Sequence, residues 1–209
     1  MPVFRVPSWI QLLFPQSYWR GDAKSKIVHL TFDDGPHSSV TPWVLQQLDA
    51  FDFKAHFFVV GQNAEKHPEL IARILELGHG LGNHTHTHRN GWKTALSPYL
   101  EDVRQCQAQL PQGKLWFRPP YGKIRPAQSR QLRAKGYRIA MWDVLSMDFD
   151  PSRSSQQLLQ KLKSLTRPGS VIVFHDSLKA EPQLKAILPS YLQWLAACGY
   201  QSRPLPSEP

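Results

Sequence analysis

The segment IVHLTFDDGP, residues 27–36, is a compact apolar run that ends in two adjacent carboxylates and a turn. Its first six residues have the β-branched and apolar character of a buried strand. The Asp33-Asp34-Gly35-Pro36 sequence that follows cannot continue a strand, because glycine and proline favour a turn. The segment therefore predicts a buried strand that delivers two carboxylates at its carboxyl end.

Strands and helices alternate on the carboxyl side of this segment. Further strands are predicted at residues 55–60, 79–83, 115–118, 137–142, 170–174 and 200–202. Helices are predicted at residues 41–51, with Thr41 as N-cap, and at 64–77, 97–110, 126–135, 154–166 and 182–198. Regular alternation favours a parallel sheet covered by helices. With about seven strand–helix units, we expect an α/β fold, a distorted (β/α) barrel in a single domain, rather than an open doubly wound sheet.

The predicted domain covers residues 26–202, between an N-terminal arm at 1–25 and a flexible tail at 203–209. The apolar stretch at residues 9–14 lies between Pro7 and Pro15 and is too short for a secretory signal. We expect this arm to pack on the domain, with a membrane-surface anchor as the alternative. No stretch approaches the length of a transmembrane helix, so we expect a cytoplasmic protein, with cell-envelope association as an alternative.

The chain has 209 residues, with 25 Lys and Arg against 16 Asp and Glu, for a formal charge of +9. Such a charge admits nucleic acid, anionic membranes or acidic polymers as partners. The basic residues are spread over helices and form no recognised nucleic-acid motif, so we expect no nucleic-acid partner. We also expect the protein to be a monomer. The two cysteines, Cys106 and Cys198, are too few for a disulfide framework or a cysteine-rich zinc site.

Polar residues follow five of the predicted strands, at the end of a β/α barrel where active sites form. These residues are Asp33-Asp34, His84-Thr85-His86-Thr87-His88, Arg118-Pro119-Pro120-Tyr121, Asp143 with Asp148, and His175-Asp176. Carboxylates, imidazoles and a guanidinium from separate strands would converge on one rim. We interpret this rim as a candidate active site.

The adjacent carboxylates of Asp33 and Asp34 repel each other unless a cation lies between them, and a divalent metal would meet this need. The alternative is a simple Asp-Gly turn. His84, His86 and His88 share a face if their segment is extended, whereas His84 and His88 pair if it forms a helical turn. Either arrangement offers two imidazoles and a carboxylate, a set typical of catalytic metals with open positions, unless the histidines form only a surface patch.

Three further features suggest roles in catalysis. Arg118 is suited to orient a carboxylate through a charge-assisted hydrogen bond, or else to pair at the surface. Pro119-Pro120 stiffens the loop and could present the Tyr121 backbone N–H at a fixed angle. His175, at the end of an apolar strand, is a candidate general acid.

Three segments in order carry a family resemblance: TFDDGP at 31–36, HTHTH at 84–88 and RPPYG at 118–122. Over residues 26–200 the chain resembles the polysaccharide deacetylases, carbohydrate esterase family 4. The resemblance implies a distorted (β/α) barrel and a metal ion held by Asp34, His84 and His88. That ion is usually zinc, with cobalt or another divalent ion possible.

The resemblance also implies the remaining roles. Asp33 is the general base that activates water, and Arg118 holds and tunes Asp33. The Tyr121 N–H stabilises the tetrahedral oxyanion, and His175 protonates the departing amine. His86 is then left to the substrate-binding surface or to the surroundings of the metal ligands.

Two segments depart from the family pattern. Leu145 stands where the fourth motif has its first aspartate, so Asp143, Asp148 or Asp176 would have to support His175. Phe149 replaces the motif's tryptophan and Val173 replaces a leucine of the fifth motif. The predicted substrate pocket comprises Phe149, Val173, Pro119 and Pro120.

The resemblance predicts a metal-dependent hydrolase that removes N-acetyl groups from an acetylated amino-sugar polymer or oligomer and releases acetate. One alternative is a small-molecule amidohydrolase that cleaves another C–N bond. Another, prompted by Leu145, is a carbohydrate-binding protein with a decayed active site.

Overall fold

A computed structural model describes residues 4–113 and 115–206 of the chain. Part of the predicted arm, residues 1–3, and part of the predicted tail, residues 207–209, lie outside the described residues. Within the described ranges the strands are β1 Ile27–Asp33, β2 His56–Val59, β3 Gly80–Asn83, β4 Trp116–Phe117, β5 Arg138–Ile139, β6 Val144–Leu145, β7 Val171–His175 and β8 Gln201–Ser202.

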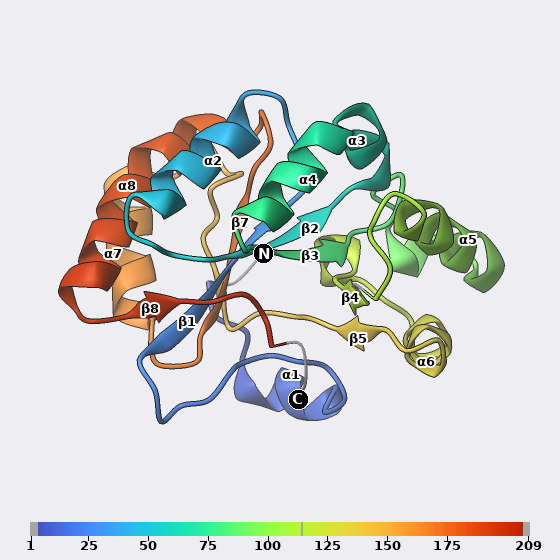
Figure 1. Cartoon of the computed structure of the whole chain (residues 1–209). Helices are drawn as coiled ribbons and strands as arrows, with labels where there is room; N and C mark the ends of the chain where they lie inside the picture. The colour runs from blue at the N-terminus through green and yellow to red at the C-terminus, as the bar shows by residue number, and fades with distance from the viewer. Residues whose placement is uncertain (1–3, 114, 207–209) are drawn as a thin grey trace.

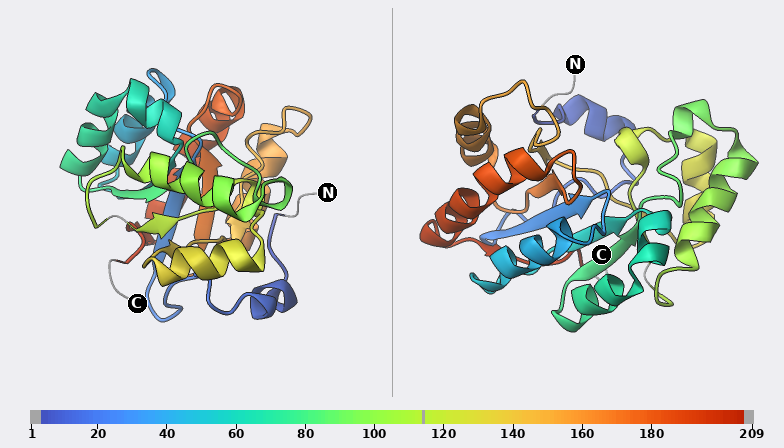
Figure 2. Two further views of the ribbon diagram at one scale, coloured as in Figure 1. Left: turned by 90° about the vertical axis from the view of Figure 1, so that its right-hand side faces the viewer. Right: turned by 90° about the horizontal axis from the view of Figure 1, so that it is seen from above.

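The strands form one parallel sheet in the order β5-β4-β3-β2-β1-β7-β6, with β8 pairing separately with β1. The sheet curls, and helices surround it when it is seen from above (Figure 2, right). The prediction of a distorted (β/α) barrel in a single domain is confirmed. The segment at residues 27–36 supplies the central strand, β1, which lies between β2 and β7.

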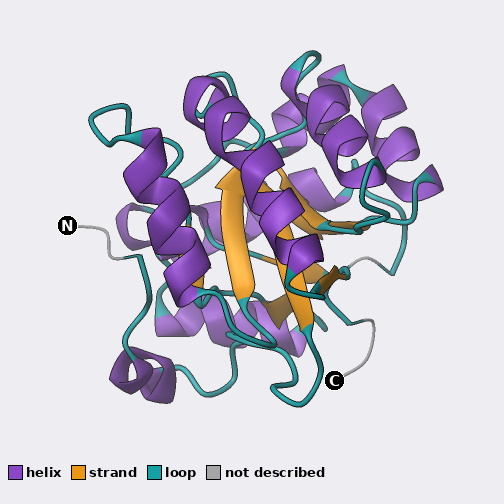
Figure 3. Cartoon of the chain, turned by 90° about the vertical axis from the view of Figure 1, so that its left-hand side faces the viewer, coloured by secondary structure: helices purple, strands orange, loops and turns teal. Residues whose placement is uncertain are grey.

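Helices cover the outside of the strands (Figures 1 and 3). The α-helices are α1 Ser8–Leu13, α2 Val40–Asp49, α3 Gly61–Lys66, α4 Pro68–Glu76, α5 Leu96–Gln107, α6 Pro126–Ala134, α7 Ser155–Leu165 and α8 Glu181–Ala197. Two short 3₁₀ helices, η1 Gly91–Lys93 and η2 Pro120–Gly122, lie in loops. None of the described helices has both the length and the apolar character needed to span a membrane.

The main core lies between the sheet and the helices α2, α7 and α8. Phe32 of β1 stacks between Phe57 and Phe174, with ring centroids 5.2 and 5.7 Å away. The helix α8 presents its apolar positions at the three- and four-residue spacing of one helical face. These buried positions are Leu184, Ile187, Leu188, Tyr191, Leu192 and Leu195. The burial of these apolar side chains holds the central strand β1 in place below the polar residues at the carboxyl ends of the strands.

The N-terminal segment lies where the sheet is not continuous, between β5 and β6. It makes isolated bridges from Arg5 to Val144, from Tyr18 to Ala140 and from Arg20 to Ser170. The N–H of Tyr18 donates to the carbonyl of Ile139, and the N–H of Leu145 donates to the carbonyl of Phe4. Helix α1 accordingly lies between the α6 and α7 sides of the molecule (Figures 1 and 2). The backbone groups at this seam are thereby hydrogen-bonded rather than exposed.

Three local predictions were wrong. The helix expected at 64–77 is two helices, because Pro68 begins α4 and cannot continue α3. The strand expected at 137–142 is only β5, and β6 is a separate pairing of Val144 and Leu145 with β7. Thr41 is not the N-cap of α2, which is Ser39; the Thr41 hydroxyl instead donates to the buried carboxylate of Asp176.

Candidate active site

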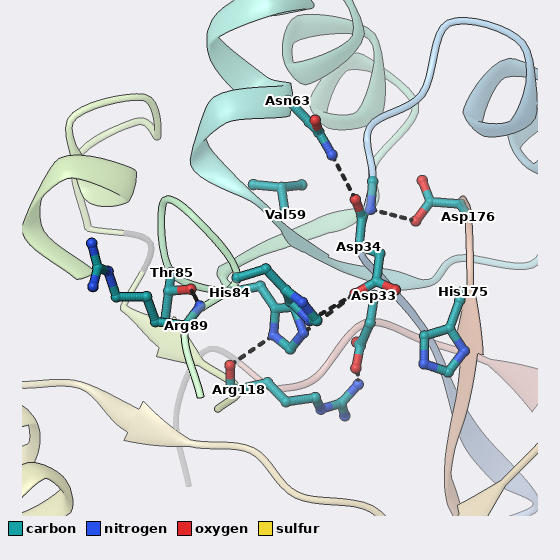
Figure 4. Close-up of polar contacts among 12 residues, drawn as sticks. Asp33, Asp34, Val59, Asn63, His84, Thr85, Arg89, Arg118, His175 and Asp176 are labelled. Carbon is teal, nitrogen blue, oxygen red and sulfur yellow. Dashed lines mark hydrogen bonds and ion pairs between the residues drawn. The ribbon is translucent and has the colours of Figure 1, made fainter. Parts of the chain in front are cut away.

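Neighbouring strands bring polar side chains to one end of the barrel (Figure 4). Asp33 and His175 are paired in register at the carboxyl ends of β1 and β7. The strands β3 and β4 pair up to their last residues, so His84 and Arg118, which follow them, lie side by side. Parallel pairing therefore gathers side chains that are far apart in the sequence, as the prediction of a common rim required.

Asp34, His84 and His88 form a group that could hold a metal ion, with one ligand atom from each residue within 4.8 Å of the others. The Asp34 Oδ1 atom is 3.1 Å from His88 Nε2 and 3.6 Å from His84 Nε2. The backbone of Asp34 is fixed as well, since the Asn63 amide donates to its carbonyl oxygen over 2.8 Å. Two imidazoles and a carboxylate on one side of an ion would leave further positions open.

The chemistry of these donors fits a divalent ion. The Nδ1 atom of His84 is 2.7 Å from the Arg118 carbonyl oxygen, which makes Nδ1 the protonated nitrogen and leaves the Nε2 lone pair for an ion. Burial lowers the pKa of His84 to about 4, so the ring is neutral at pH 7. Burial alone would raise the pKa of Asp34, but the hydrogen bond from His88 and the nearby imidazoles hold it well below its usual range.

Asp33 lies beside this group and is held by a buried guanidinium. The Nη1 atom of Arg118 donates to Asp33 Oδ1 and to the Thr31 hydroxyl, both over 2.7 Å, and Nη2 donates to the Met141 carbonyl over 3.0 Å. Arg118 is fully buried, and its guanidinium lies 4.1 Å from the ring centroid of Phe58. These contacts fix the Asp33 carboxylate and its charge at the rim.

His175 is supported by Asp148. The His175 Nδ1 atom is 2.7 Å from Asp148 Oδ1, and the His175 backbone N–H donates to Asp148 Oδ2 over 2.8 Å. Burial alone would lower the pKa of His175, but the charge and hydrogen bond of Asp148, with smaller contributions from Asp34 and Asp33, raise it to about 9. Of the three aspartates considered in place of Leu145, Asp148 is the one bonded to His175.

The other two aspartates have different partners. Asp143 accepts from the Ser170 hydroxyl over 2.7 Å and pairs with Arg167 over 3.1 Å. Asp176 accepts from Thr41 and from the Gly35 N–H, over 2.5 and 3.2 Å, and burial raises its pKa to about 8. A side chain on Gly35 would place its Cβ 2.1 Å from Asp176 Oδ2, which explains the glycine after the two aspartates.

The loop that carries His84 and His88 is held by Asp102, a buried residue of α5 that sequence reasoning missed. Asp102 Oδ2 accepts from the N–H groups of His86 and Thr87, over 2.9 and 3.0 Å. Its Oδ1 accepts from the Thr87 hydroxyl over 2.8 Å and from Arg89 Nε over 3.0 Å. His88 itself has a left-handed φ of 56°, a conformation that needs such support. No spacing in the sequence distinguishes Asp102 from an ordinary surface acid of an amphipathic helix.

His86 does not join the metal group. Its Nε2 atom faces Glu65 at 3.9 Å, and a Cβ on Gly61 would come within 2.5 Å of its Nδ1 atom. The side chain is therefore packed against α3, where it supports the loop rather than an ion.

Aromatic and proline residues border the rim. Tyr121 adopts a left-handed φ of 60°, is 60% exposed, and places its ring 4.6 Å from that of His88. Phe149 lies edge-on to His175, with centroids 5.2 Å apart. Val173 is in register with Thr31 of β1, two residues before His175 on β7. Pro119 and Pro120 are buried between Arg118 and Tyr121.

Comparison with known proteins identifies relatives over most of the chain. A family model described as polysaccharide deacetylase matches residues 20–140. A peptidoglycan-N-acetylglucosamine deacetylase of Bacillus cereus is 32% identical over 177 residues, 81% of this chain and 64% of the relative. A chitooligosaccharide deacetylase of Azorhizobium caulinodans is 30% identical over 195 residues, 86% of this chain and 92% of the relative. The chain thus spans slightly less than two thirds of the first relative and nearly all of the second.

A solved structure shows the same fold. The crystal structure of the Bc1960 peptidoglycan N-acetylglucosamine deacetylase, in complex with 4-naphthalen-1-yl-N-oxidanyl-benzamide, has a TM-score of 0.87 and 30% sequence identity. The match covers 95% of both chains. On these grounds the chain belongs to the polysaccharide deacetylase family, carbohydrate esterase family 4.

Proposed function

We propose that the chain is a metal-dependent hydrolase that removes N-acetyl groups from an amino sugar within a glycan and releases acetate. The observation that carries this proposal is the Asp34, His84 and His88 group beside two supported acid–base residues, Asp33 and His175. Relatives that are named for peptidoglycan N-acetylglucosamine and for chitooligosaccharides support an acetylated amino sugar as the substrate.

We propose zinc as the ion, because one carboxylate and two neutral imidazoles with open positions are a donor set that suits it. When bound, such an ion polarises a carbonyl oxygen and lowers the pKa of water. His84 would bind through Nε2, since Arg118 holds its Nδ1 atom. Asp34 and His88 would complete the set.

The remaining residues move protons and hold charge. Asp33 takes a proton from the attacking water, and Arg118 keeps its carboxylate in place. His175 is charged at neutral pH and gives its proton to the nitrogen as the C–N bond breaks. The Tyr121 backbone N–H would donate to the oxyanion that develops on the acetyl group. The products are acetate and a free amine.

The acetyl methyl group would contact the apolar part of the rim. Phe149 lies against His175, and Val173 lies on the same face of β7. Pro119 and Pro120 stiffen the loop before Tyr121, and we propose that they also border this position. We propose this apolar surface as the acetyl-binding position.

Acetate release provides the test. The purified chain is incubated with zinc or cobalt and with N-acetylglucosamine oligomers, peptidoglycan strands or a small acetamide. Release from a glycan, and its loss in Asp33→Asn, would support the proposal. Release from the small acetamide alone would indicate a small-molecule amidohydrolase. Glycan binding without release would indicate a decayed site, against which the intact His175–Asp148 pair argues.

The cell envelope is the setting that we propose for this activity. The Bacillus cereus relative is named for peptidoglycan, a glycan of the cell wall. Fractionation of the producing cells, with immunodetection of the chain, would test this setting against the cytoplasmic alternative. A monomer remains the prediction for the oligomeric state, which size-exclusion chromatography with light scattering would check.

A further inference from the structure

Asp34, the carboxylate of the candidate metal group, has a backbone conformation that residues other than glycine rarely adopt. Its φ is 76°, in the left-handed region. This conformation brings the Cβ atom close to a carbonyl oxygen, so it persists only where surrounding contacts impose it. The contacts that hold this backbone therefore decide where the Asp34 carboxylate lies.

Asp176, the first residue after β7, bonds to the chain on both sides of Asp34. Its backbone N–H donates to the Asp33 carbonyl over 3.1 Å, and its Oδ1 atom accepts from the Gly35 N–H over 3.2 Å. Figure 4 shows Asp176 and Asn63 approaching this turn from different sides. The two peptide units that flank Asp34 are thus both fixed by one residue. Rotation about the φ or ψ of Asp34 would break at least one of these bonds.

The carboxyl group of Asp176 is itself held in place. Its Oδ2 atom accepts from the Thr41 hydroxyl over 2.5 Å, and that hydroxyl accepts from the His37 N–H over 2.8 Å. Asp176 is 1% exposed, and a buried carboxyl group is costly unless its oxygens are hydrogen-bonded. Each of the two oxygens has such a partner, so the side chain is fixed in the orientation that receives the Gly35 N–H.

A second buried aspartate supports the other left-handed residue of the metal group. His88 has a φ of 56°, and Asp102 accepts from the two N–H groups before it, those of His86 and Thr87. Neither Asp102 nor Asp176 belongs to the group of possible ligands. Both left-handed members of that group are therefore held by hydrogen bonds to an aspartate that lies outside it.

We propose that Asp176 is a positioning residue of the metal site. It keeps Asp34 in its left-handed conformation, and the Asp34 Oδ1 atom thereby stays 3.1 Å from His88 Nε2 and 3.6 Å from His84 Nε2. Thr41 acts through Asp176 by fixing its carboxyl group. This inference rests on the proposed function, from which it takes the metal ion, and it assigns a role to a residue outside the ligand group.

Zinc binding by the purified chain, measured by calorimetry well below the Tm, tests the role. Asp176→Ala removes the carboxyl group, whereas Asp176→Asn keeps its shape and an oxygen that can accept from the Gly35 N–H. Thr41→Val removes the hydroxyl alone. The matched controls are Asp143→Asn, which changes another fully buried carboxylate, and Thr166→Val, which removes a hydroxyl at the end of α7.

We expect the zinc Kd to rise about tenfold or more in Asp176→Ala, and less in Asp176→Asn and Thr41→Val. The two controls should stay within about twofold of the wild type, even though their Tm falls, because they lie apart from the metal group. A merely structural role for Asp176 would lower the Tm and leave the zinc Kd unchanged.

Amide hydrogen exchange in the metal-free protein is a second readout, which needs neither zinc nor substrate. The Gly35 N–H, followed by NMR, should exchange about three- to tenfold faster in Asp176→Ala than in the wild type, because one hydrogen bond is lost. Asp143→Asn should leave this rate unchanged.

An unchanged zinc Kd in Asp176→Ala would overturn the positioning role, whether or not the Gly35 N–H exchanges faster. If Asp176→Ala does not fold, the zinc Kd of Thr41→Val decides in the same way. A wild type that binds zinc but releases no acetate from any glycan would overturn the proposed function and leave the positioning role standing.

Discussion

Replacing Asp148 with asparagine should move the alkaline limit of activity. Asp148 raises the pKa of His175 to about 9 against the effect of burial. Without the carboxylate, the pKa should fall to its ordinary 6.5 or below, because burial continues to disfavour the charged ring. At pH 8 the protonated fraction of His175 would then fall from about 90% to about 3%. If proton donation by His175 limits turnover, the rate at pH 8 falls about thirtyfold.

The assay is acetate release from an N-acetylglucosamine oligomer between about pH 5.5 and about pH 10, at a fixed saturating concentration of metal. The pH dependence of kcat/KM should show the alkaline limb near 9 in the wild type and at least two units lower in Asp148→Asn. Asp150→Asn removes a nearby half-buried carboxylate that pairs with Arg153 rather than His175, and it should leave the profile unchanged. An alkaline limb that stays in place in Asp148→Asn would refute the assignment of His175 as the acid that Asp148 tunes.

Thermal unfolding gives an independent measure of the same pair. The pKa of His175 is higher in the folded chain than the ordinary 6.5. The pair therefore contributes stability that is fully present below about pH 6.5 and is lost as the pH rises through about 9. The difference in Tm between wild type and Asp148→Asn should be greatest at pH 6 and should narrow by pH 10.

Three further substitutions test separate parts of the site. Asp33→Asn should abolish acetate release while zinc binding by calorimetry persists; retained turnover would exclude Asp33 as the base. Asp102→Asn should weaken zinc binding about tenfold or more by loosening the histidine loop, whereas Glu101→Gln on the same helix should not; equal affinities would contradict this role. Gly35→Ala should lower the free energy of unfolding by about 1–3 kcal/mol through its clash with Asp176, and an unchanged Tm would be the contrary result.

The sequence predicted the elements whose patterns are local. The apolar β-branched run of β1 and the regular alternation of strands and helices were enough to predict a barrel, because each depends on residues close together in the chain. Two pairings could not be predicted. The bridges of the N-terminal segment to Ala140 and Val144 depend on contacts more than 100 residues apart. The two-residue strand β6 is also too short to show any periodicity.

The candidate site also has residues that the sequence revealed and residues that it did not. Asp33, Asp34 and the histidines could be found in the sequence because they directly follow strands. Whether His86 joins His84 and His88 at the metal group could not be derived from spacing, since the loop includes left-handed residues that neither a strand nor a helix pattern describes. Asp102 was missed because it acts through backbone N–H groups of another segment.

Zinc titration of the metal-free protein tests the central claim most directly. The wild type should bind zinc at one site, and His84→Ala should lose that site. His86→Ala is the matched control, because His86 belongs to the same loop but faces Glu65, and it should keep the site. Loss of the site in His86→Ala, or undiminished binding in His84→Ala, would contradict the assignment of Asp34, His84 and His88 as the metal ligands.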